Sequence, residues 1–338
     1  MSSTLSDGDL TVLAGADVAA ALDGCEAEIL DAVSAAYQAH SLGETSLPHS
    51  TFLRFPNGPR DRIIALPAYL GGEKPVAGVK WIASFPGNLQ RDLPRASAVM
   101  VLNSAETGRA ETILEASTIS AKRTAASAAL AAKQLCAPGR ANPTGVVGCG
   151  PINLEVVRFL AAAGVGSVHF RAFDLDAGRA RQFAERCRAE VPGVEVEVVD
   201  TLDEVLRGCP LVSLATTAAV PHISDLSACP PGAVILHVSL RDLSPEIILD
   251  AYNVVDDVDH VNRAETSIHL ASKAAGNVDF VHCTLGDLLL GRDVPPRDPA
   301  RLTVFSPFGL GMLDLAVAQL ARARAAGRGV NVPAFSAT

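Results

Sequence analysis

The sequence predicts an α/β protein of two domains, the second of which is built on a doubly wound parallel sheet. Three observations support this prediction. From Pro143 onward, short apolar runs alternate with helical patterns. A glycine-containing turn follows the first of these runs. The 338 residues, of which 49% are hydrophobic and 19% charged, have a globular composition and exceed what one hydrophobic core usually holds.

The N-terminal residues predict an α+β domain. Residues 17–40 are rich in alanine and place apolar side chains at helical spacing, and short β-like pieces follow over 43–78 among glycines and prolines. Further β-like runs lie at 76–88 and 96–103, and a long helical pattern over 120–136 ends near a Pro-Gly pair. We expect residues 1–125 to form this domain.

The second half of the chain predicts the parallel sheet. The strands TGVVG, SVHFRAF, VEVEVV, LVSLAT and AVILHVS alternate with helical patterns over 151–163, 176–190 and 201–207. We expect these elements to form a domain over 126–306. A last helical run, 311–327, comes after the sheet is complete, so residues 307–338 are expected to return to the first domain. The first few residues and the tail from about Gly327 are expected to be disordered.

Composition and charge exclude several classes of protein. The net charge of −9 would repel a phosphate backbone, so we expect no nucleic-acid partner. The opening MSSTLSDGDL has neither a basic nor an apolar leader segment, and no stretch of 18 residues stays apolar, which predicts a cytoplasmic protein without a membrane span. Seven cysteines without a CxxC pair, and the lack of an HExxH motif, predict neither a disulfide framework nor a bound metal.

A glycine turn predicts a Rossmann-type cofactor site. In TGVVGCGPIN, Gly148 and Gly150 lie between a strand and a helix, where backbone N–H groups can approach a pyrophosphate. A glycine pair alone is more often a tight turn, but the flanking strand and helix favour a nucleotide site. The third fingerprint position is Asn153, whose bulk we expect to push the helix slightly away from the strand. The predicted contacts are Gly148, Gly150, Pro151, Ile152 and Asn153.

An acidic residue at the end of the second strand favours NAD over NADP. Asp174 lies 26 residues after Gly148, where a carboxylate can bind the adenosine ribose and repel a 2′-phosphate. The alternative for this residue is helix capping, a role that we assign to Asp176. Thr216 and Thr217 follow another predicted strand and are also expected to contact the cofactor.

Three basic residues lie among apolar or small neighbours: Arg54 in STFLRFP, Lys80 in VAGVKWIAS and Arg123 in SAKRTAAS. Each cation in such a setting needs an anion, which is either a bound carboxylate or an internal salt-bridge partner, and for a single example the salt bridge is the more common outcome. Asp242 follows a predicted strand in AVILHVSLRDLSPE, where ligands bind in open parallel sheets. These four residues are therefore candidates for a substrate site.

Together these segments resemble the ornithine cyclodeaminase/mu-crystallin family over nearly the whole chain. The resemblance rests on GVKWIASFPGN, the KRTAA helix, VGCGPIN, LRDLSPE and the closing SPFGLGMLDLAVAQLA. The segments ASAVMVLNSAETGRAETIL and SLRDLSPEIILDAYNVVDDVDHV look like the branch that oxidises N-(2-amino-2-carboxyethyl)-L-glutamate. The products of that branch are L-2,3-diaminopropionate and 2-oxoglutarate.

The resemblance implies a role for each candidate residue. Arg54 and Arg123 would clamp carboxylates of an amino-acid substrate, for which the bidentate guanidinium is well suited. Lys80 would lie against the reacting carboxylate and amine, and Asp242 would handle protons or water, so these two are the expected catalytic residues. The resemblance also implies NAD as cofactor and a homodimer built by the N-terminal domain with the last helix.

Two other functions remain open. One is an ornithine cyclodeaminase or a related amino-acid or imine oxidoreductase, in which intramolecular attack by an amine replaces hydrolysis. The other is a non-catalytic, crystallin-like protein that binds NAD, because a fold does not fix a function. The presence of both Lys80 and Asp242 argues against the non-catalytic alternative.

Overall fold

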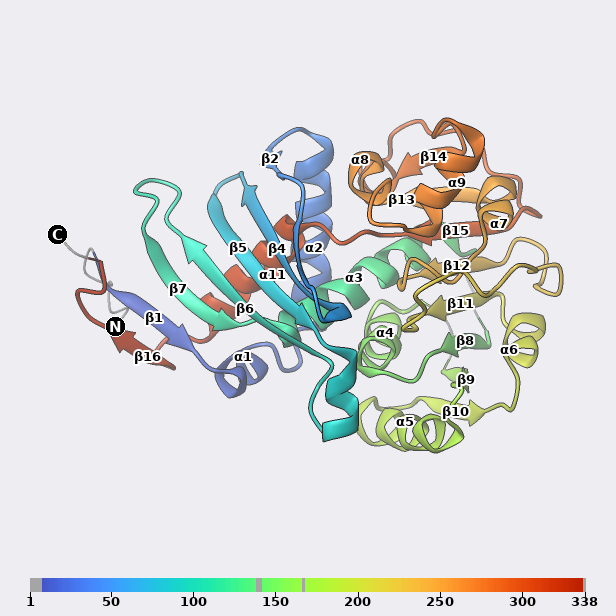
Figure 1. The fold of residues 1–338 in the computed structure, drawn as a ribbon, viewed down its shortest axis with the longest axis horizontal. Helices are drawn as coiled ribbons and strands as arrows, with labels where there is room; N and C mark the ends of the chain where they lie inside the picture. Colours follow the sequence, from blue (N-terminus) through green and yellow to red (C-terminus); the bar gives the residue numbers. More distant parts are fainter. Residues whose placement is uncertain (1–7, 138–141, 166–167, 337–338) are drawn as a thin grey trace. The chain divides into compact units, whose positions relative to one another are not determined.

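The structure is a computed structural model that describes residues 8–137, 142–165 and 168–336 (Figure 1). The chain divides into two compact units. Unit 1 contains Met1–Arg123 and Leu310–Thr338, and unit 2 contains Thr124–Gly309. These boundaries lie within three residues of those that the sequence predicts. Among the described residues, no helix is both long and apolar enough to cross a lipid bilayer.

Unit 1 is built on an eight-stranded mixed sheet. Its strands are β1 (Leu10–Leu13), β2 (Thr45–Ser46), β3 (Thr51–Phe55), β4 (Gly58–Leu70), β5 (Val76–Ser84), β6 (Ala96–Asn103), β7 (Ala110–Glu115) and β16 (Val330–Val332). The strand order is β16-β1-β7-β6-β5-β4-β2, with β3 also paired to β4. Strands β4 to β7 form an antiparallel meander, whereas β1 runs parallel to β7.

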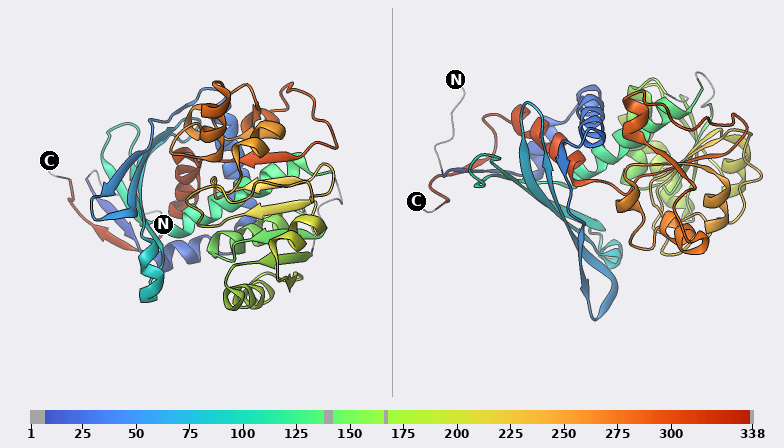
Figure 2. Two further views of the ribbon diagram at one scale, coloured as in Figure 1. Left: turned by 45° about the vertical axis from the view of Figure 1, so that its right-hand side comes forward. Right: turned by 90° about the horizontal axis from the view of Figure 1, so that it is seen from above.

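The helices of unit 1 cover one face of this sheet. Helix α11 (Gly311–Arg324) packs against β4 and β5, and α1 (Gly15–Ala21) and α2 (Glu26–Ser41) pack against α11 (Figure 2). Because side chains alternate between the faces of a strand, Lys80 and its cross-strand partners Leu66 and Met100 all point to the covered face. All three side chains are buried.

Unit 2 is a doubly wound parallel sheet. Its strands are β8 (Thr144–Val147), β9 (His169–Phe173), β10 (Glu195–Val198), β11 (Leu211–Leu214), β12 (Val234–His237), β13 (Tyr252–Val255), β14 (Val281–Thr284) and β15 (Thr303–Ser306). The order is β10-β9-β8-β11-β12-β15-β13-β14, and all the pairings are parallel. The predicted Rossmann-type architecture is confirmed.

Helices lie on both faces of the sheet in unit 2 (Figure 1). They are α4 (Pro151–Ala162), α5 (Ala177–Glu190), α6 (Leu202–Gly208), α7 (Pro245–Asp250), α8 (Val258–Val261), α9 (Ser267–Ala275) and α10 (Leu285–Leu289), together with most of α3 (Ser117–Leu135). With both faces covered, every residue of β8, β11, β12, β13 and β15 is buried. This explains why these strands are mostly apolar in the sequence instead of alternating between apolar and polar residues.

The structure differs from the sequence prediction at both ends of unit 1. The helical pattern over 17–40 forms two helices, because Gly24 adopts a left-handed conformation (φ 63°) and breaks the run before α2. The tail from about Gly327 is not disordered: it forms β16, which pairs with β1 in antiparallel fashion. The expectation for the first few residues concerns residues 1–7, which lie outside the described part of the chain.

Candidate active site

The glycine turn of unit 2 connects β8 to α4 and leaves the N-terminus of that helix open. Gly148 has a φ of 88°, and a Cβ there would lie 2.6 Å from the carbonyl oxygen of Ala215. Gly150 is the N-cap of α4, and a Cβ there would meet nothing within 4 Å. Pro151 takes the first helical position. The turn therefore has the space and the exposed backbone donors that a pyrophosphate needs.

Asn153 supports this turn from inside the fold. Its side chain is fully buried, and its Nδ2 donates to the carbonyl oxygens of Val147 (3.0 Å) and Gly148 (2.8 Å). Its Oδ1 accepts a hydrogen bond from Ser213 Oγ (2.7 Å). The expectation that Asn153 merely displaces the helix missed this role, because the sequence does not show that both ends of the amide find partners.

Asp174 lies beside the glycine turn, at the end of β9. Its Oδ2 accepts the N–H of Cys149 (2.8 Å), and its Oδ1 accepts the N–H of Asp176 (3.0 Å). Asp176 is the N-cap of α5, with its carboxylate accepting the N–H groups of Gly178 and Arg179, so its predicted capping role is confirmed. The half-buried Asp174 carboxylate is thus fixed next to the first turn of α4.

A cluster around Asp242 occupies the carboxyl ends of β11 and β12. The Asp242 side chain is fully buried and accepts hydrogen bonds from Thr216 Oγ1 and Ser239 Oγ. His222 Nε2 lies 3.1 Å from Oδ1, and His237 Nε2 lies 3.4 Å from Oδ2. Burial by itself would raise the pKa of this carboxyl, but the adjacent His237 and the two hydroxyl donors hold the pKa well below its usual range.

The backbone before Asp242 is strained. Leu240 has a φ of 70°, which a non-glycine residue seldom adopts, and its carbonyl oxygen accepts the N–H of Ser267 (2.7 Å). Thr216, predicted to contact the cofactor, donates its hydroxyl to Asp242, whereas Thr217 is exposed. Since strained residues collect at functional sites, this loop is the strongest candidate for chemistry in unit 2.

In unit 1, Lys80 and Arg123 meet at a carboxylate that the sequence analysis did not single out. Lys80 Nζ donates to Asp314 Oδ2 (2.7 Å) and to Ser120 Oγ (3.3 Å), and Arg123 Nε donates to Asp314 Oδ1 (3.1 Å). Asp314 is fully buried and Lys80 is 1% exposed. The internal salt bridge, the commoner outcome for such cations, is therefore present at Lys80 and Arg123.

The sequence does contain a feature that could have identified Asp314 as a buried ion-pair partner: it is a single acidic residue in an apolar helix. It is the only charged residue in GMLDLAVAQLA, and a buried charge requires a partner. Burial and the neighbouring Arg123 lower the pKa of Lys80 and Asp314 raises it, and the net result of these effects is a pKa of about 8. Lys80 is consequently a buried amine that can change its charge near neutral pH.

The third predicted cation, Arg54, is exposed on β3. Its guanidinium lies 5.6 Å from the ring centroid of Phe52, and no described contact joins it to the Lys80–Asp314–Arg123 triad. The strand register nevertheless places it on the same sheet face as Lys80. Arg54 is opposite Arg62, and Arg62 is opposite Ser84, which lies four residues along β5 from Lys80.

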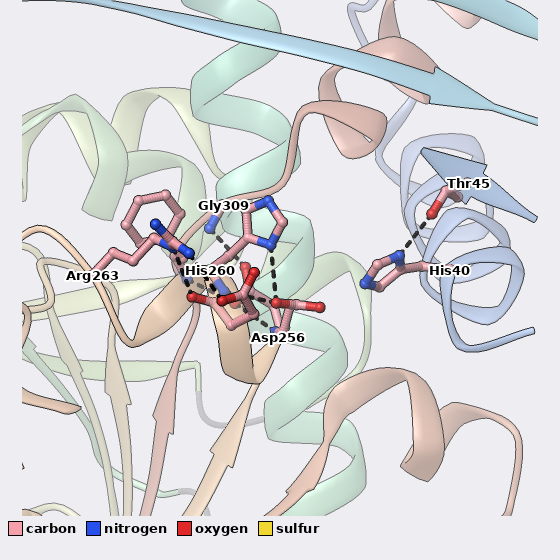
Figure 3. Close-up of polar contacts among 9 residues, drawn as sticks. His40, Thr45, Asp256, His260, Arg263 and Gly309 are labelled. Atoms are coloured by element: carbon pink, nitrogen blue, oxygen red, sulfur yellow. Dashed lines mark hydrogen bonds and ion pairs between the residues drawn. The ribbon is translucent and has the colours of Figure 1, made fainter. Parts of the chain in front are cut away.

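A further buried carboxylate, Asp256, has a structural role. It follows β13 and accepts the N–H groups of Asp257 (2.9 Å), Phe308 (2.9 Å) and Gly309 (2.6 Å), as Figure 3 shows for Gly309. Burial raises its pKa. Asp256 thus fixes the segment that follows β15. Within the described residues, no three His, Cys, Asp or Glu side chains are grouped so as to hold a metal ion.

Comparison with known proteins gives the following matches. The ornithine cyclodeaminase/mu-crystallin family model matches residues 12–329. The N-((2S)-2-amino-2-carboxyethyl)-L-glutamate dehydrogenase of Staphylococcus aureus is 30% identical over 86% of this chain and 87% of its own. The alanine dehydrogenase of Archaeoglobus fulgidus is 30% identical over 90% and 92%. A solved archaeal alanine dehydrogenase dimer with bound NAD superposes with a TM-score of 0.83 at 26% identity, covering 96% and 99%.

Proposed function

Because the chain belongs to the ornithine cyclodeaminase/mu-crystallin family, we propose that it oxidises N-(2-amino-2-carboxyethyl)-L-glutamate with NAD. The C–N bond of the glutamate part becomes an imine, which water hydrolyses to L-2,3-diaminopropionate and 2-oxoglutarate. The coarser assignment is shown by the relatives: the chain is an NAD-dependent oxidoreductase that acts on amino-acid derivatives.

The observation that supports a substrate with several carboxylates is the arginine-rich end of the Lys80 face. Arg95 Nη1 donates to Ser84 Oγ (2.8 Å), which brings its guanidinium to the end of β5 where Arg62 lies opposite Ser84 and Arg54 opposite Arg62. Burial lowers the pKa of Arg95. Among the described residues, no carboxylate lies within ion-pair distance of Arg54 or Arg95.

Arg54 and Arg95 need an anion more than cations with a described acidic partner do. Like charges directly opposite each other on a sheet repel, as Arg54 and Arg62 do, and a partly buried guanidinium without an acid loses hydration without compensation. A substrate with three carboxylates supplies the missing charge through bidentate contacts. Alanine has a single carboxylate and would leave this end of the face without a partner.

The cofactor is held by residues whose geometry suits a dinucleotide. The N–H groups of Gly150 and Ile152 would bind the pyrophosphate at the N-terminus of α4, and Asp174 would bind the adenosine ribose. When bound, NAD supplies the oxidising capacity by accepting a hydride. Preference for NAD over NADP is part of the proposal, since the fixed Asp174 carboxylate would repel a 2′-phosphate.

The remaining steps depend on side chains of this chain. Substrate carboxylates would be bound and oriented by Lys80, Arg54 and Arg123. Binding in a fixed orientation lowers the entropic cost of bringing the reacting carbon and nitrogen into position. The positive charge on Lys80 would stabilise the carboxylate adjacent to the reacting carbon. The cluster around Asp242 would handle the protons of the amine and of the attacking water.

The test is a substrate panel in which Arg95 is varied. Wild-type protein with NAD should form NADH with N-(2-amino-2-carboxyethyl)-L-glutamate far faster than with alanine, ornithine or glutamate. Arg95→Ala should lower kcat/KM for that substrate by about 10- to 150-fold, the loss of one charge-assisted contact. Arg91→Ala, an exposed arginine in the adjoining segment, is the matched control.

Two results of this panel would contradict the proposal. Equal or faster NADH formation with alanine would favour the alternative of an alanine dehydrogenase, to which the chain is equally similar. NADH formation from ornithine, with a cyclic product, would favour a cyclodeaminase. If none of the four compounds reduces NAD, the proposed substrate is wrong.

The proposal includes a homodimer formed through the open face of the unit 1 sheet. Leu53, Tyr69, Trp81 and Val99 all point to the face opposite Lys80, as the register shows, and each is at least 37% exposed. Helix α11, expected to contribute apolar surface to the dimer, instead buries that surface inside unit 1. The archaeal alanine dehydrogenase is a dimer, and a second copy would bury this apolar face.

Light scattering tests the dimer. Trp81→Asp should produce a monomer at concentrations where the wild type is a dimer, whereas Val168→Asp, at an exposed apolar position in unit 2, should leave the dimer intact. A monomeric wild type would end this part of the proposal. A cytoplasmic location also remains a proposal, with which the seven unpaired cysteines agree.

A further inference from the structure

His222 lies beside Asp242, with its Nε2 3.1 Å from Asp242 Oδ1. We propose that His222 is the catalytic group that accepts and returns the substrate's protons, and that the Asp242 carboxylate positions it. This inference rests on the proposed function, because it assigns a residue to the proton transfers of that reaction.

The backbone fixes His222 against the Asp242 loop. The N–H groups of His222 and Ile223 both donate to the carbonyl oxygen of Asp242 (2.9 Å each), and the N–H of Ser244 donates to the carbonyl oxygen of Ile223 (2.9 Å). Ile223 and Leu243 form a parallel bridge. Backbone hydrogen bonds in both directions therefore hold the segment that carries the His222 imidazole to the loop that carries the Asp242 carboxylate.

Asp242 itself is poorly placed to exchange protons with a substrate. Its side chain is fully buried, and both carboxylate oxygens already have hydrogen-bond donors, Thr216 on Oδ1 and Ser239 on Oδ2. These neighbours, together with His237, also hold its pKa well below the usual range. A carboxylate in this environment remains ionised and orients a neighbour, as the acid of a catalytic dyad does.

The His222 imidazole has the accessibility that Asp242 lacks. Its side chain is 44% exposed, and its Nε2 lies 3.1 Å from Asp242 Oδ1. When Nε2–H donates to this carboxylate, the ring presents an unprotonated Nδ1 on its other side. The ring lies near the carboxyl ends of β11 and β12, the edge at which open parallel sheets bind ligands.

The chemistry needs one group that both takes and gives a proton. His222 Nδ1 removes the proton of the secondary ammonium, so that the nitrogen lone pair can form the C=N bond as the hydride leaves the carbon. The imidazolium releases that proton to solvent, after which water adds to the carbon and gives a proton to the imidazole. The imidazolium gives this proton to the nitrogen as the C–N bond breaks, and the hydroxyl proton passes to the departing amine, which leaves a ketone and a primary ammonium. In the net reaction, substrate ammonium, NAD+ and water give ketone, primary ammonium, NADH and one proton.

The test removes the imidazole and then restores it from solution. His222→Ala should lower kcat by about 10²-fold or more, and added imidazole should restore part of the lost rate. His222→Gln, which fills the space and keeps an N–H donor for Asp242, should show the same loss without rescue. NADH binding, followed by fluorescence, should be unchanged in both variants.

A second measurement does not depend on turnover. The ring ¹⁵N shifts of His222, identified by their loss in His222→Gln, should show that the neutral ring carries its proton on Nε2 and not on Nδ1. Asp242→Asn should abolish this preference. His169→Ala, which removes an exposed histidine at the start of β9, is the control for nonspecific effects of imidazole.

The outcomes separate this inference from the proposed function. A His222→Ala variant that turns over within threefold of wild type, or one that imidazole does not rescue, overturns the catalytic role. A His222→Gln variant with wild-type rate also overturns it, since glutamine keeps the hydrogen bond and lacks the base. If the wild type oxidises none of the panel substrates, the proposed function fails, and the ¹⁵N measurement still decides whether the pair exists.

Discussion

Asp314 in unit 1 and Asp242 in unit 2 are both fully buried carboxylates, but the groups around them are opposite in kind. Asp314 bridges two cations, Lys80 and Arg123. Asp242 is surrounded by two hydroxyl donors and two imidazoles, none of which carries a fixed charge. The first carboxylate neutralises a lysine and an arginine, whereas the second supplies a single negative charge to hydroxyl and imidazole groups.

The comparison teaches that burial alone does not assign a role to a carboxylate. Asp314 offsets the cost of burying the cations, so we expect its removal to affect the fold and the charge state of Lys80. Asp242 is paired with hydroxyl and imidazole groups and not with a lysine or arginine, so we expect its removal to affect catalysis more than the fold.

The largest effect is expected for catalysis at Asp242. Asp242→Asn keeps the side-chain volume but removes the charge that orients His222, so turnover should fall by about 10²- to 10⁴-fold. NADH affinity, measured by fluorescence titration, should stay the same. A variant that turns over within a few-fold of wild type would contradict any role of Asp242 in the reaction, and thermal melting controls for folding.

A stability effect of similar size is expected for Asp314. Asp314→Asn leaves Lys80 and Arg123 without their shared anion, and removal of one partner from a buried ion pair typically costs about 3–5 kcal/mol of unfolding free energy. Urea unfolding followed by circular dichroism measures this loss. Asp203→Asn, which breaks an exposed helical ion pair with Arg207, is the control and should change the unfolding free energy little. Equal losses in the two variants would contradict the comparison.

A smaller effect is expected in the pH dependence that Lys80 confers. Its pKa is lowered to about 8, so Lys80 is charged below this pH and neutral above it. If its charge binds the substrate carboxylate, kcat/KM should fall as the pH rises through about 8. Lys80→Arg stays charged throughout the range and should remove this fall. A profile that is the same in both proteins would assign the transition to another group.

The smallest effect is expected at a third carboxylate, Asp174, which is half-buried and held by backbone N–H groups alone. Asp174→Ser removes the charge that repels a 2′-phosphate, so the ratio of kcat/KM with NAD to that with NADP should fall. The unfolding free energy should change less than in Asp314→Asn, because no buried cation loses its partner. Equal use of both cofactors by the wild type would show that Asp174 does not select between them.

Local patterns in the sequence predicted much of the fold and part of the site. The alternation of apolar strands and helices predicted the parallel sheet of unit 2, since strands covered on both faces are mostly apolar along their whole length. The glycine turn and the cap at Asp176 are local as well, because Gly148 and Asp176 act through backbone groups only a few residues away. Short-range geometry of this kind can be read from neighbouring residues.

What the sequence could not give were the partners that lie far along the chain. Lys80 and Asp314 are separated by 234 residues, and nothing in the sequence around either residue indicates that the other is its partner. His222 was passed over because an imidazole in VPHIS has no local feature that distinguishes it from a surface histidine. By itself the sequence determined the sheet of unit 2, the glycine turn and the set of unusual cations. Only the tertiary structure decided which charges neutralise one another and which histidine meets Asp242, because those pairings depend on strand register and helix packing.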